Sequence, residues 1–475
     1  MRKLLLKMVL LTGIVLVCVS YMSYYVTEKR EGVDRWTEFY NQEENTVDIL
    51  FTGSSLSIFS FIPQVFNAKL NAKTYNLAIP VLNIKQIYYN LPEIVKHQKL
   101  KVLVVEARSI DIVDAGEDNR LGYKFENLDG QNLNLNKVKS VLGQFSEKSN
   151  IVNSFFPYFR NHHEWANLEL LEENLNYEYK PSEYDGYKIG IYRRVKDNTI
   201  KKRLKEVPKD FKFPEENIEY LGKVVDFCNE NDIKLHIVRA PVLNYSTYKG
   251  FYLDEVSPIT KKLCDSLQIS YTDLYPTGDV EKLNITKVDY YDMVHFNHLG
   301  ALKFSEKIAD VFANQYNFEP KEDDAFMQND AEYYLYNNKL DEAKTVFKGD
   351  FQLSEDILIK EVRIQRTKNN EHIFFILLDK ETDITEMTSH RLGIYYYPVK
   401  EQMPLLKLPK EAKVSWKRIV TDHAIPTNYK DYKVVHAAYE TIDPTNFRKI
   451  EIKFFKVREG WIKKILTIED VDLTE

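Results

Sequence analysis

Cysteine is scarce in this sequence, which contains three cysteines among 475 residues. Cys18 falls within the first apolar segment, so only Cys228 and Cys264 remain as a pair, and nothing indicates a disulfide framework. Cysteine and histidine nowhere cluster at the spacing of zinc ligands. We therefore expect a protein that requires neither a metal nor another cofactor.

An excess of positive charge is also lacking. Lys and Arg total 65 against 71 Asp and Glu, which leaves a net charge of −6. This balance gives no reason to expect nucleic acid as a partner. Repeats and low-complexity tracts are absent as well, and hydrophobic residues make up 44% of the chain. The composition is typical of a globular chain, and the length suits two or three domains.

One apolar run stands at the N-terminus. Residues Met8 to Val26 carry no charge and are numerous enough for a helix that crosses a hydrocarbon core. Three basic residues precede the run, namely Arg2, Lys3 and Lys7. The positive-inside rule then leaves the N-terminus in the cytoplasm and the bulk of the chain outside. A cleaved signal peptide is the alternative, but no small-x-small cleavage site follows, so we favour an uncleaved anchor over residues 1–30.

An alternation of apolar strands and amphipathic helices follows a short polar stretch, residues 32–46, that suits a helical stalk. The expected strands are 47–52, 73–77, 101–106, 234–238 and 269–273. The expected helices are 57–68, 83–96 with a kink at Pro92, 214–231, 257–267 and 297–314. Strands that are apolar throughout and separated by helices predict an α/β fold, a parallel sheet covered on both faces, over residues 31–318.

Two regions depart from this rhythm. Residues 114–212 are rich in Asn, Tyr and charge, and we interpret them as a helical insertion, for which a lid is one interpretation. Residues 319–350 resemble a helical connector, with a helix over Ala331 to Phe347. After the connector, short alternating strands separated by charged turns predict an all-β, sandwich-like domain over 351–475.

The first candidate for chemistry is the segment Gly53-Ser54-Ser55, where the first strand should end and a helix begin. Ligands of doubly wound sheets bind at the carboxyl ends of the strands. A serine presented from such a turn becomes a nucleophile if a base lies nearby. Taken alone, the segment is more typical of a serine that caps a helix.

The second candidate is Asp292-Met293-Val294-His295. Among the ten histidines, His295 alone has an aspartate three residues earlier. This spacing suits a turn in which the carboxylate orients the imidazole and leaves the other ring nitrogen for a serine. An ordinary surface Asp–His pair is the alternative, and it is about equally consistent with these residues alone.

Together these segments resemble blocks I and V of the SGNH/GDSL hydrolase superfamily, and the resemblance covers roughly residues 1–315. The string from Asp292 to Lys303 is similar to a form found in bacterial exported SGNH-like proteins. These include proteins of cell-envelope polysaccharide clusters and, more distantly, the teichoic-acid D-alanylation family. The resemblance implies a flavodoxin-like, three-layer sheet. It says nothing about the C-terminal β domain.

The resemblance also implies roles for individual residues. Ser55 matches the nucleophile, His295 the base and Asp292 the orienting acid. The family's second oxyanion donor is a glycine, which is replaced here by Ala78, whose backbone N–H serves equally if its conformation allows. The family's third block carries an asparagine that is missing here, and Arg108 is a candidate substitute. An Arg108 that faces solvent, or that pairs with Glu106 or Asp111, is the simpler interpretation.

From these matches we expect a two-step serine acyl transfer, as an esterase or an O-acyltransferase. The expected substrate is an O-acylated cell-envelope or exported polysaccharide, and a membrane acyltransferase is a candidate partner. The main alternative is a non-catalytic envelope assembly or glycan-binding protein that retains a degenerate SGNH domain. The missing asparagine favours this alternative, and the intact Ser55, Asp292 and His295 oppose it.

Overall fold

The structure is a computed structural model, and the chain in it forms two compact units. Unit 1 comprises residues 1–188, 201–285 and 301–322, and unit 2 comprises 189–200, 286–300 and 323–475. The residues it describes are 2–27, 31–111, 120–177, 179, 184–188, 212–242, 253–275, 282–283, 285, 289–290, 292, 294–319, 340, 342–355, 357–366, 372–382, 390–405, 417–421, 425–429, 431–437, 442–456 and 460–474.

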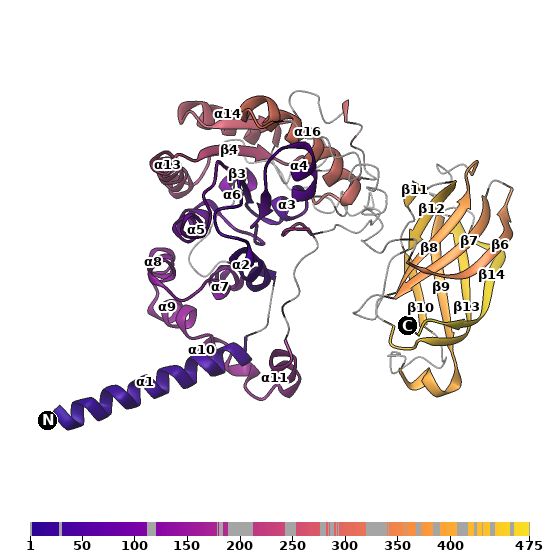
Figure 1. Ribbon diagram of the computed structural model, residues 1–475, viewed down its shortest axis with the longest axis horizontal. Coiled ribbons are helices and arrows are strands. Elements are labelled where there is room, and N and C mark those ends of the chain that lie inside the picture. The colour runs from indigo at the N-terminus through magenta and orange to yellow at the C-terminus, as the bar shows by residue number, and fades with distance from the viewer. Residues whose placement is uncertain are drawn as a thin grey trace. The chain divides into compact units, whose positions relative to one another are not determined.

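A parallel sheet forms the centre of unit 1 (Figure 1). Its strands are β1 (Ile49–Thr52), β2 (Thr74–Asn76), β3 (Val102–Glu106), β4 (Lys234–Arg239) and β5 (Ser270–Asp273). They are ordered β2-β1-β3-β4-β5, and every neighbouring pair is parallel. This is the flavodoxin-like order. The predicted α/β fold and all of the predicted strands are therefore confirmed.

Helices cover both faces of this sheet. Successive side chains of a strand point to opposite faces, so both faces carry apolar side chains that must be buried. On one face, Leu50 joins a core shared by α2 (Glu31–Asn41), α5 (Ile84–His97) and α13 (Glu215–Glu230). On the other face, Phe51 stacks on Phe61 at 4.7 Å between ring centroids. Phe61 in turn contacts Phe304, which belongs to α16 (His298–Tyr316).

Several predicted helices differ in detail. The helix expected over 57–68 is two helices, α3 (Ser55–Ile58) and α4 (Pro63–Lys69), because Pro63 suits a first helical position and not an interior one. Pro92 lies inside α5 without ending it. The segment expected as a stalk is α2, which buries Trp36 and Phe39 in the core. The helix expected from 257 begins earlier, as α14 (Leu253–Ser266).

The described part of the insertion is helical, as expected. After α6 (Arg108–Asp111) come α7 (Leu121–Asp129), α8 (Leu135–Gln144), α9 (Lys148–Phe155), α10 (Pro157–Arg160), η1 (His162–Glu164) and α11 (Leu168–Leu175). The first three of these insertion helices, α7 to α9, share a small apolar core that includes Phe125, Leu128 and Val141. The N-terminal apolar run forms α1 (Arg2–Tyr25), whose residues 3–25 are long and apolar enough to cross a membrane.

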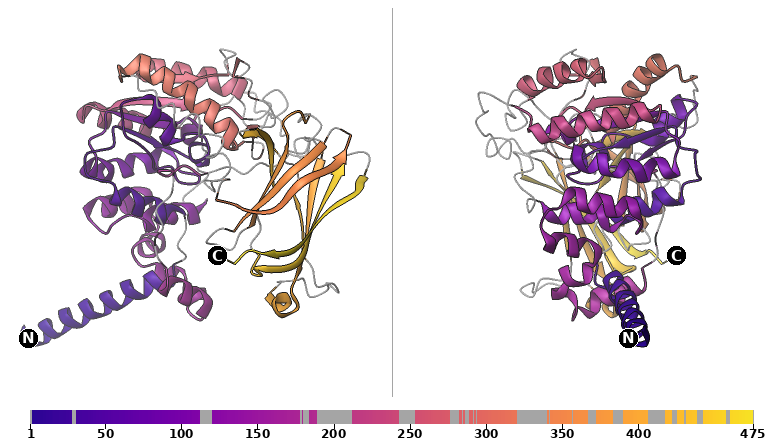
Figure 2. Two further views of the ribbon diagram at one scale, coloured as in Figure 1. Left: turned by 45° about the vertical axis from the view of Figure 1, so that its right-hand side comes forward. Right: turned by 90° about the vertical axis from the view of Figure 1, so that its left-hand side faces the viewer.

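Unit 2 contains two antiparallel sheets, ordered β10-β9-β13-β14 and β11-β12-β8-β7-β6 (Figure 2). Their strands are β6 (Lys344–Ser354), β7 (Ile357–Arg366), β8 (His372–Asp379), β9 (His390–Pro398), β10 (Lys417–Thr421), β11 (Ile425–Tyr429), β12 (Tyr432–Ala437), β13 (Asn446–Lys456) and β14 (Gly460–Asp472), with η4 (Lys400–Leu405) between β9 and β10. Buried side chains from both sheets form one apolar core. The strand-rich C-terminal region is thus confirmed.

The connector helix expected over Ala331 to Phe347 is wrong at its C-terminal end. Residues from Lys344 onward form β6 and pair with β7, because their side chains alternate along a strand. Residues 320–339 lie outside the described residues.

Candidate active site

The turn after β1 requires a glycine. Gly53 has a φ of +142°, and a Cβ at this position would lie 3.0 Å from the Cβ of Glu106. Its missing side chain lets the ends of β1 and β3 approach closely. These two strands flank the switch point of a 2-1-3-4-5 sheet, which is where such folds bind their ligands.

The two serines that follow Gly53 have different environments. Ser54 is buried and is the N-cap of α3: its Oγ accepts from the N–H of Leu56 at 3.4 Å and lies 3.5 Å from Oε2 of Glu106. Ser55 is the first residue of α3 and is only partly buried. Ser54 therefore has the capping role typical of such a turn, and Ser55 is the more exposed of the two serines.

Asp292 and His295 form a hydrogen-bonded pair. Oδ2 of Asp292 lies 2.8 Å from Nδ1 of His295, and Oδ1 accepts from the backbone N–H groups of Val294 at 2.8 Å and His295 at 2.9 Å. The carboxylate thus holds both the turn and the ring. With its Nδ1 bound to the acid, the imidazole presents Nε2 as the nitrogen for proton transfer.

The electrostatics of this pair favour an ionised acid. Burial raises the pKa of Asp292, but the hydrogen bond and charge of His295, together with the two backbone N–H groups, outweigh burial and lower this pKa below its ordinary value. The two side chains remain accessible, at 42% for Asp292 and 17% for His295. A charged carboxylate that orients an accessible imidazole is what a serine triad requires.

The structure brings Asp292 and His295 together in unit 2, whereas Ser55 lies in unit 1. The pairing of Ser55 with His295 therefore stays a prediction. Helix α16 begins three residues after His295, and Asn297 caps it by accepting from the N–H of Gly300 at 3.2 Å, as its position in the sequence predicts.

Ala78, the expected second oxyanion donor, already has an acceptor for its N–H. That N–H donates to Oδ1 of Asn76 at 3.2 Å. Asn76 is itself fixed, because its Nδ2 donates to the carbonyls of Ser57 at 2.9 Å and Phe61 at 3.1 Å. An oxyanion bound by Ala78 would have to displace Asn76.

Arg108 begins α6, directly beyond the end of β3. Its backbone N–H donates to Oε2 of Glu106 at 3.0 Å, the same oxygen that Ser54 approaches. Burial lowers the pKa of the Arg108 guanidinium, and the nearby Asp111 and Glu106 oppose this effect. Arg108 thus lies near the two acidic groups that the simpler interpretation named, and its backbone N–H is bound to one of them.

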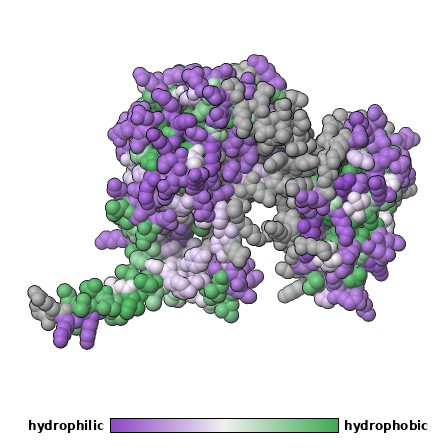
Figure 3. Space-filling view, viewed as in Figure 1, coloured by the Kyte–Doolittle hydropathy of each residue, from purple (hydrophilic) through white to green (hydrophobic). Residues whose placement is uncertain are grey.

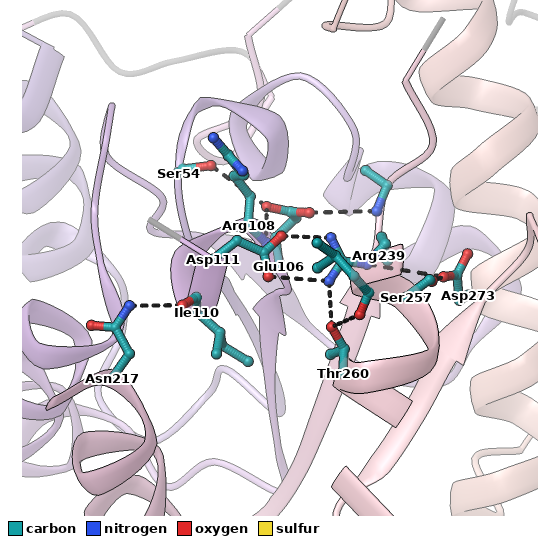
Figure 4. Close-up of polar contacts among 12 residues, drawn as sticks. Ser54, Glu106, Arg108, Ile110, Asp111, Asn217, Arg239, Ser257, Thr260 and Asp273 are labelled. Carbon is teal, nitrogen blue, oxygen red and sulfur yellow. Dashed lines mark hydrogen bonds and ion pairs between the residues drawn. The ribbon is translucent and has the colours of Figure 1, made fainter. Parts of the chain in front are cut away.

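A buried polar network, to which the sequence analysis assigned no function, lies at the ends of β3, β4 and β5 (Figure 4). The guanidinium of Arg239 binds Asp111 through two contacts of 2.7 and 3.3 Å and donates to Thr260 at 2.7 Å and to Tyr271 at 3.1 Å. A basic or acidic residue at the end of an apolar strand, as in Val-Leu-Val-Val-Glu106, is the signal that could have indicated this network.

Glu106 is the member of this network closest to the serine turn. It is fully buried and accepts from backbone N–H groups of Arg108 at 3.0 Å and Ala240 at 3.5 Å. Burial raises its pKa to about 8, with Arg239 acting in the opposite direction and Asp111 adding to the rise. Glu106 therefore connects the turns that follow β1, β3 and β4.

Histidine, tryptophan and cysteine side chains also occur outside the candidate site. His162 and His163 have ring planes 87° apart, and Trp165 stacks on Tyr158 at 4.4 Å while its indole N–H donates to the Tyr158 carbonyl. Cys228 and Cys264 are both free and buried. Within the described ranges, no group of three His, Cys, Asp or Glu residues is arranged to hold a metal ion.

Comparisons with known proteins give little further information. No family model matches the sequence, and no curated protein matches it. A solved structure from Parabacteroides merdae, provisionally described as a GDSL-like lipase, is similar over 58% of this chain and 99% of its own. The TM-score of this similarity is 0.29 and the sequence identity is 11%.

Proposed function

We propose that this protein is a membrane-anchored, extracytoplasmic serine enzyme of the SGNH/GDSL type, an esterase or O-acyltransferase. The observation that carries the proposal is the Asp292–His295 pair, in which Oδ2 of Asp292 lies 2.8 Å from Nδ1 of His295. A partly buried serine that opens a helix at the switch point of the sheet supplies that nucleophile.

The reaction would proceed in two steps. Nε2 of His295 takes the proton of Ser55 while Oγ attacks the carbonyl carbon of an ester, and Asp292 stabilises the imidazolium. Collapse of the tetrahedral intermediate expels the alcohol, which receives the proton from His295, and leaves an acyl-Ser55. Water or a sugar hydroxyl then attacks the acyl group, again with His295 as the base.

The negative oxygen of the intermediate needs hydrogen-bond donors. The backbone N–H groups of Ser55 and Ala78 are the proposed pair, and the latter requires Asn76 to release it. Arg108 is the proposed third donor, because it follows β3 at the place where the family has an asparagine. These three groups come from the turns after β1, β2 and β3.

Helix α16 packs within unit 1 beside the segment that follows Ser55. Oγ of Ser305 donates to the carbonyl of Ser60 at 2.9 Å and accepts from the N–H of Ile62 at 3.0 Å. The approach of His295 to Ser55 is part of the proposal.

The proposed substrate is an O-acylated polysaccharide of the cell envelope or in export, with a membrane acyltransferase as a candidate donor of acyl groups. Helix α1 supports the location, because its residues 3–25 suffice to cross a bilayer and basic residues precede its apolar run. The resemblance to envelope proteins supports the substrate class.

A second candidate function is non-catalytic glycan binding or envelope assembly. Two observations favour it: the N–H of Ala78 is bonded to Asn76, and Glu106 and Arg108 stand where the family has its third block. In this case the Asp292–His295 pair would serve only to hold its turn.

The test is labelling by a fluorophosphonate probe, which reacts with activated serines. The full chain should become labelled, the Ser55→Ala variant should not, and the Ser54→Ala variant should retain most of the labelling as a matched control. Loss of labelling only in Ser54→Ala would show that the register of the motif is wrong. A wild-type protein that never labels, in a folded state, would favour the non-catalytic function.

A further inference from the structure

The last turn of α1 is built into unit 1, although the rest of this helix is exposed. Ser23, Val26 and Thr27 are buried, whereas none of the apolar window of the helix is buried. Because the last carbonyls of a helix lack partners within it, they must be satisfied from outside. The residues that donate hydrogen bonds to these carbonyls therefore show which part of unit 1 surrounds the end of α1.

Two asparagines of the insertion supply those partners. Nδ2 of Asn161 donates to the carbonyl of Val26 at 3.0 Å. Nδ2 of Asn174 donates to the carbonyls of Tyr25 at 2.7 Å and Thr27 at 3.0 Å. We call residues 157–175, which include α10, η1 and α11, the collar. The collar holds the end of α1 at a fixed place on unit 1 (Figure 1).

The collar also exposes large apolar side chains. Phe159 is 47% exposed, Trp165 45%, Leu168 76% and Leu175 65%. On α11, Leu168 and Leu175 are seven residues apart and share one face, whereas Asn174 lies on another face, toward α1. Figure 3 shows hydrophobic surface on α1 and again at the end of unit 1 to which α1 is attached.

The exposure of these leucines to water is unfavourable, because the full burial of one apolar side chain is worth about 1.5–3 kcal/mol of free energy. Their position suggests the medium that buries them. Tyr21, Tyr24 and Tyr25 lie in the last two turns of α1, and tyrosine and tryptophan are enriched where membrane-spanning helices leave the hydrocarbon. The collar contacts α1 at this same level.

We propose that the collar lies in the interfacial layer of the bilayer that α1 crosses, with Leu168, Leu175, Phe159 and Trp165 inserted among the lipids. This proposal rests on the proposed function in one respect, the crossing of the membrane by α1. Two attachments, one spanning and one interfacial, restrict the tilt of unit 1 and hold its sheet edge at a constant orientation to the membrane surface.

The proposed attraction between the collar and the bilayer is hydrophobic and not electrostatic. Residues 157–175 carry one arginine against four glutamates, Glu164, Glu169, Glu172 and Glu173, so the charge of the collar is 1 − 4 = −3. A basic surface would bind anionic lipid and be released by salt. The collar should instead insert into neutral phosphatidylcholine and remain inserted at high salt.

Spin labels in the full chain, reconstituted in phosphatidylcholine vesicles, test the proposal. Cys18 is the one exposed cysteine, so a nitroxide there reports on α1. In a Cys18→Ser background, nitroxides are placed at Leu168→Cys and Leu175→Cys. Ile218→Cys on α13 is the matched control, because Ile218 is also an exposed apolar residue of unit 1. Accessibility to oxygen and to a soluble nickel chelate measures the depth of each label.

The expected result is a ratio of oxygen to nickel accessibility several-fold higher at positions 168 and 175 than at 218, unchanged by added salt. If position 18 lies in the hydrocarbon and positions 168 and 175 match 218, the collar proposal is overturned while the anchor stands. If position 18 itself is aqueous, the anchor fails, and the collar with it. Cysteine substitutions at these exposed positions should leave the fold intact, and circular dichroism checks this.

Discussion

Two of the clusters of ionisable side chains that the structure describes differ in their exposure to solvent and in the number of their hydrogen bonds. Around Arg239, in unit 1, the side chains of Arg239, Asp111 and Glu106 are buried, and Arg239 has several partners. At Asp292 and His295, in unit 2, the side chains are partly exposed. The buried cluster contains the carboxylic acid with the more strongly shifted pKa, Glu106. A shifted pKa reflects burial as readily as catalysis, so accessibility must be considered as well.

The largest expected effect concerns the accessible pair. Asp292→Asn keeps an acceptor for the turn but weakens the control of the His295 tautomer, so ester hydrolysis should fall by about 10⁴-fold. The free energy of unfolding should change little, because the pair is partly exposed. Hydrolysis of p-nitrophenyl acetate and urea denaturation measure the two quantities. An Asp292→Asn variant with wild-type activity would remove Asp292 from the mechanism.

The buried cluster should show the opposite behaviour. Arg239→Met leaves the carboxylate of Asp111 buried without its partner, which should lower the free energy of unfolding by about 3–5 kcal/mol. The double variant Arg239→Met/Asp111→Asn should recover part of this loss, because the buried charge of Asp111 is removed as well. Lys223→Met, which removes an exposed partner of Glu219, is the control and should leave the unfolding midpoint unchanged. Equal losses of unfolding free energy in Arg239→Met and Lys223→Met would contradict the difference between the buried and the exposed ion pair.

Glu106 should make stability depend on pH. Its pKa is about 8 in the folded protein against an ordinary 4.5, so the folded state binds the proton more tightly. Its contribution to stability is therefore complete below about pH 4.5 and is lost as pH rises through about 8, at up to about 1.4 kcal/mol per pH unit. The Glu106→Gln variant should lose less stability than the wild type between pH 5 and pH 8. Parallel curves, from urea denaturation at each pH, would show that Glu106 is ionised in the folded state.

The smallest effect is expected at Ser54. Ser54→Ala removes the N-cap of α3 and one contact to Glu106, which should cost about 1 kcal/mol of stability. Thermal unfolding measures this loss. Ser55→Ala, which keeps the cap, should be more stable than Ser54→Ala. The reverse order would mean that Ser55 and not Ser54 supports the turn.

Much of the α/β architecture could be predicted because it depends on local pattern. Apolar runs such as Val102 to Val105 predict buried parallel strands, and Asn297 predicts the start of α16 because capping is a local interaction. Where a prediction failed, tertiary packing determined the structure. Trp36 and Phe39 turn an apparently polar stalk into a core helix, since a few aromatic side chains outweigh the charges around them.

In the candidate site, too, some contacts could be predicted from the sequence and others could not. The spacing of Asp292 and His295 in the sequence was enough to predict their contact, because three residues of a turn bring them within reach. The acceptor of the Ala78 N–H could not be predicted in this way, since Asn76 acts as an acceptor only once its Nδ2 has been fixed by Ser57 and Phe61.

The sequence by itself thus determined the strands of the sheet, the apolar N-terminal helix, the strand-rich C-terminal region and the local Asp–His pair. Only the tertiary structure decided that Ser54 binds Glu106, that Arg239 joins Asp111 across 128 residues, and that Asn161 and Asn174 hold the end of α1. The physical reason is one of range. Capping, turn spacing and hydrophobic period act between near neighbours in the chain, whereas a buried polar group must find its partner wherever the fold places one.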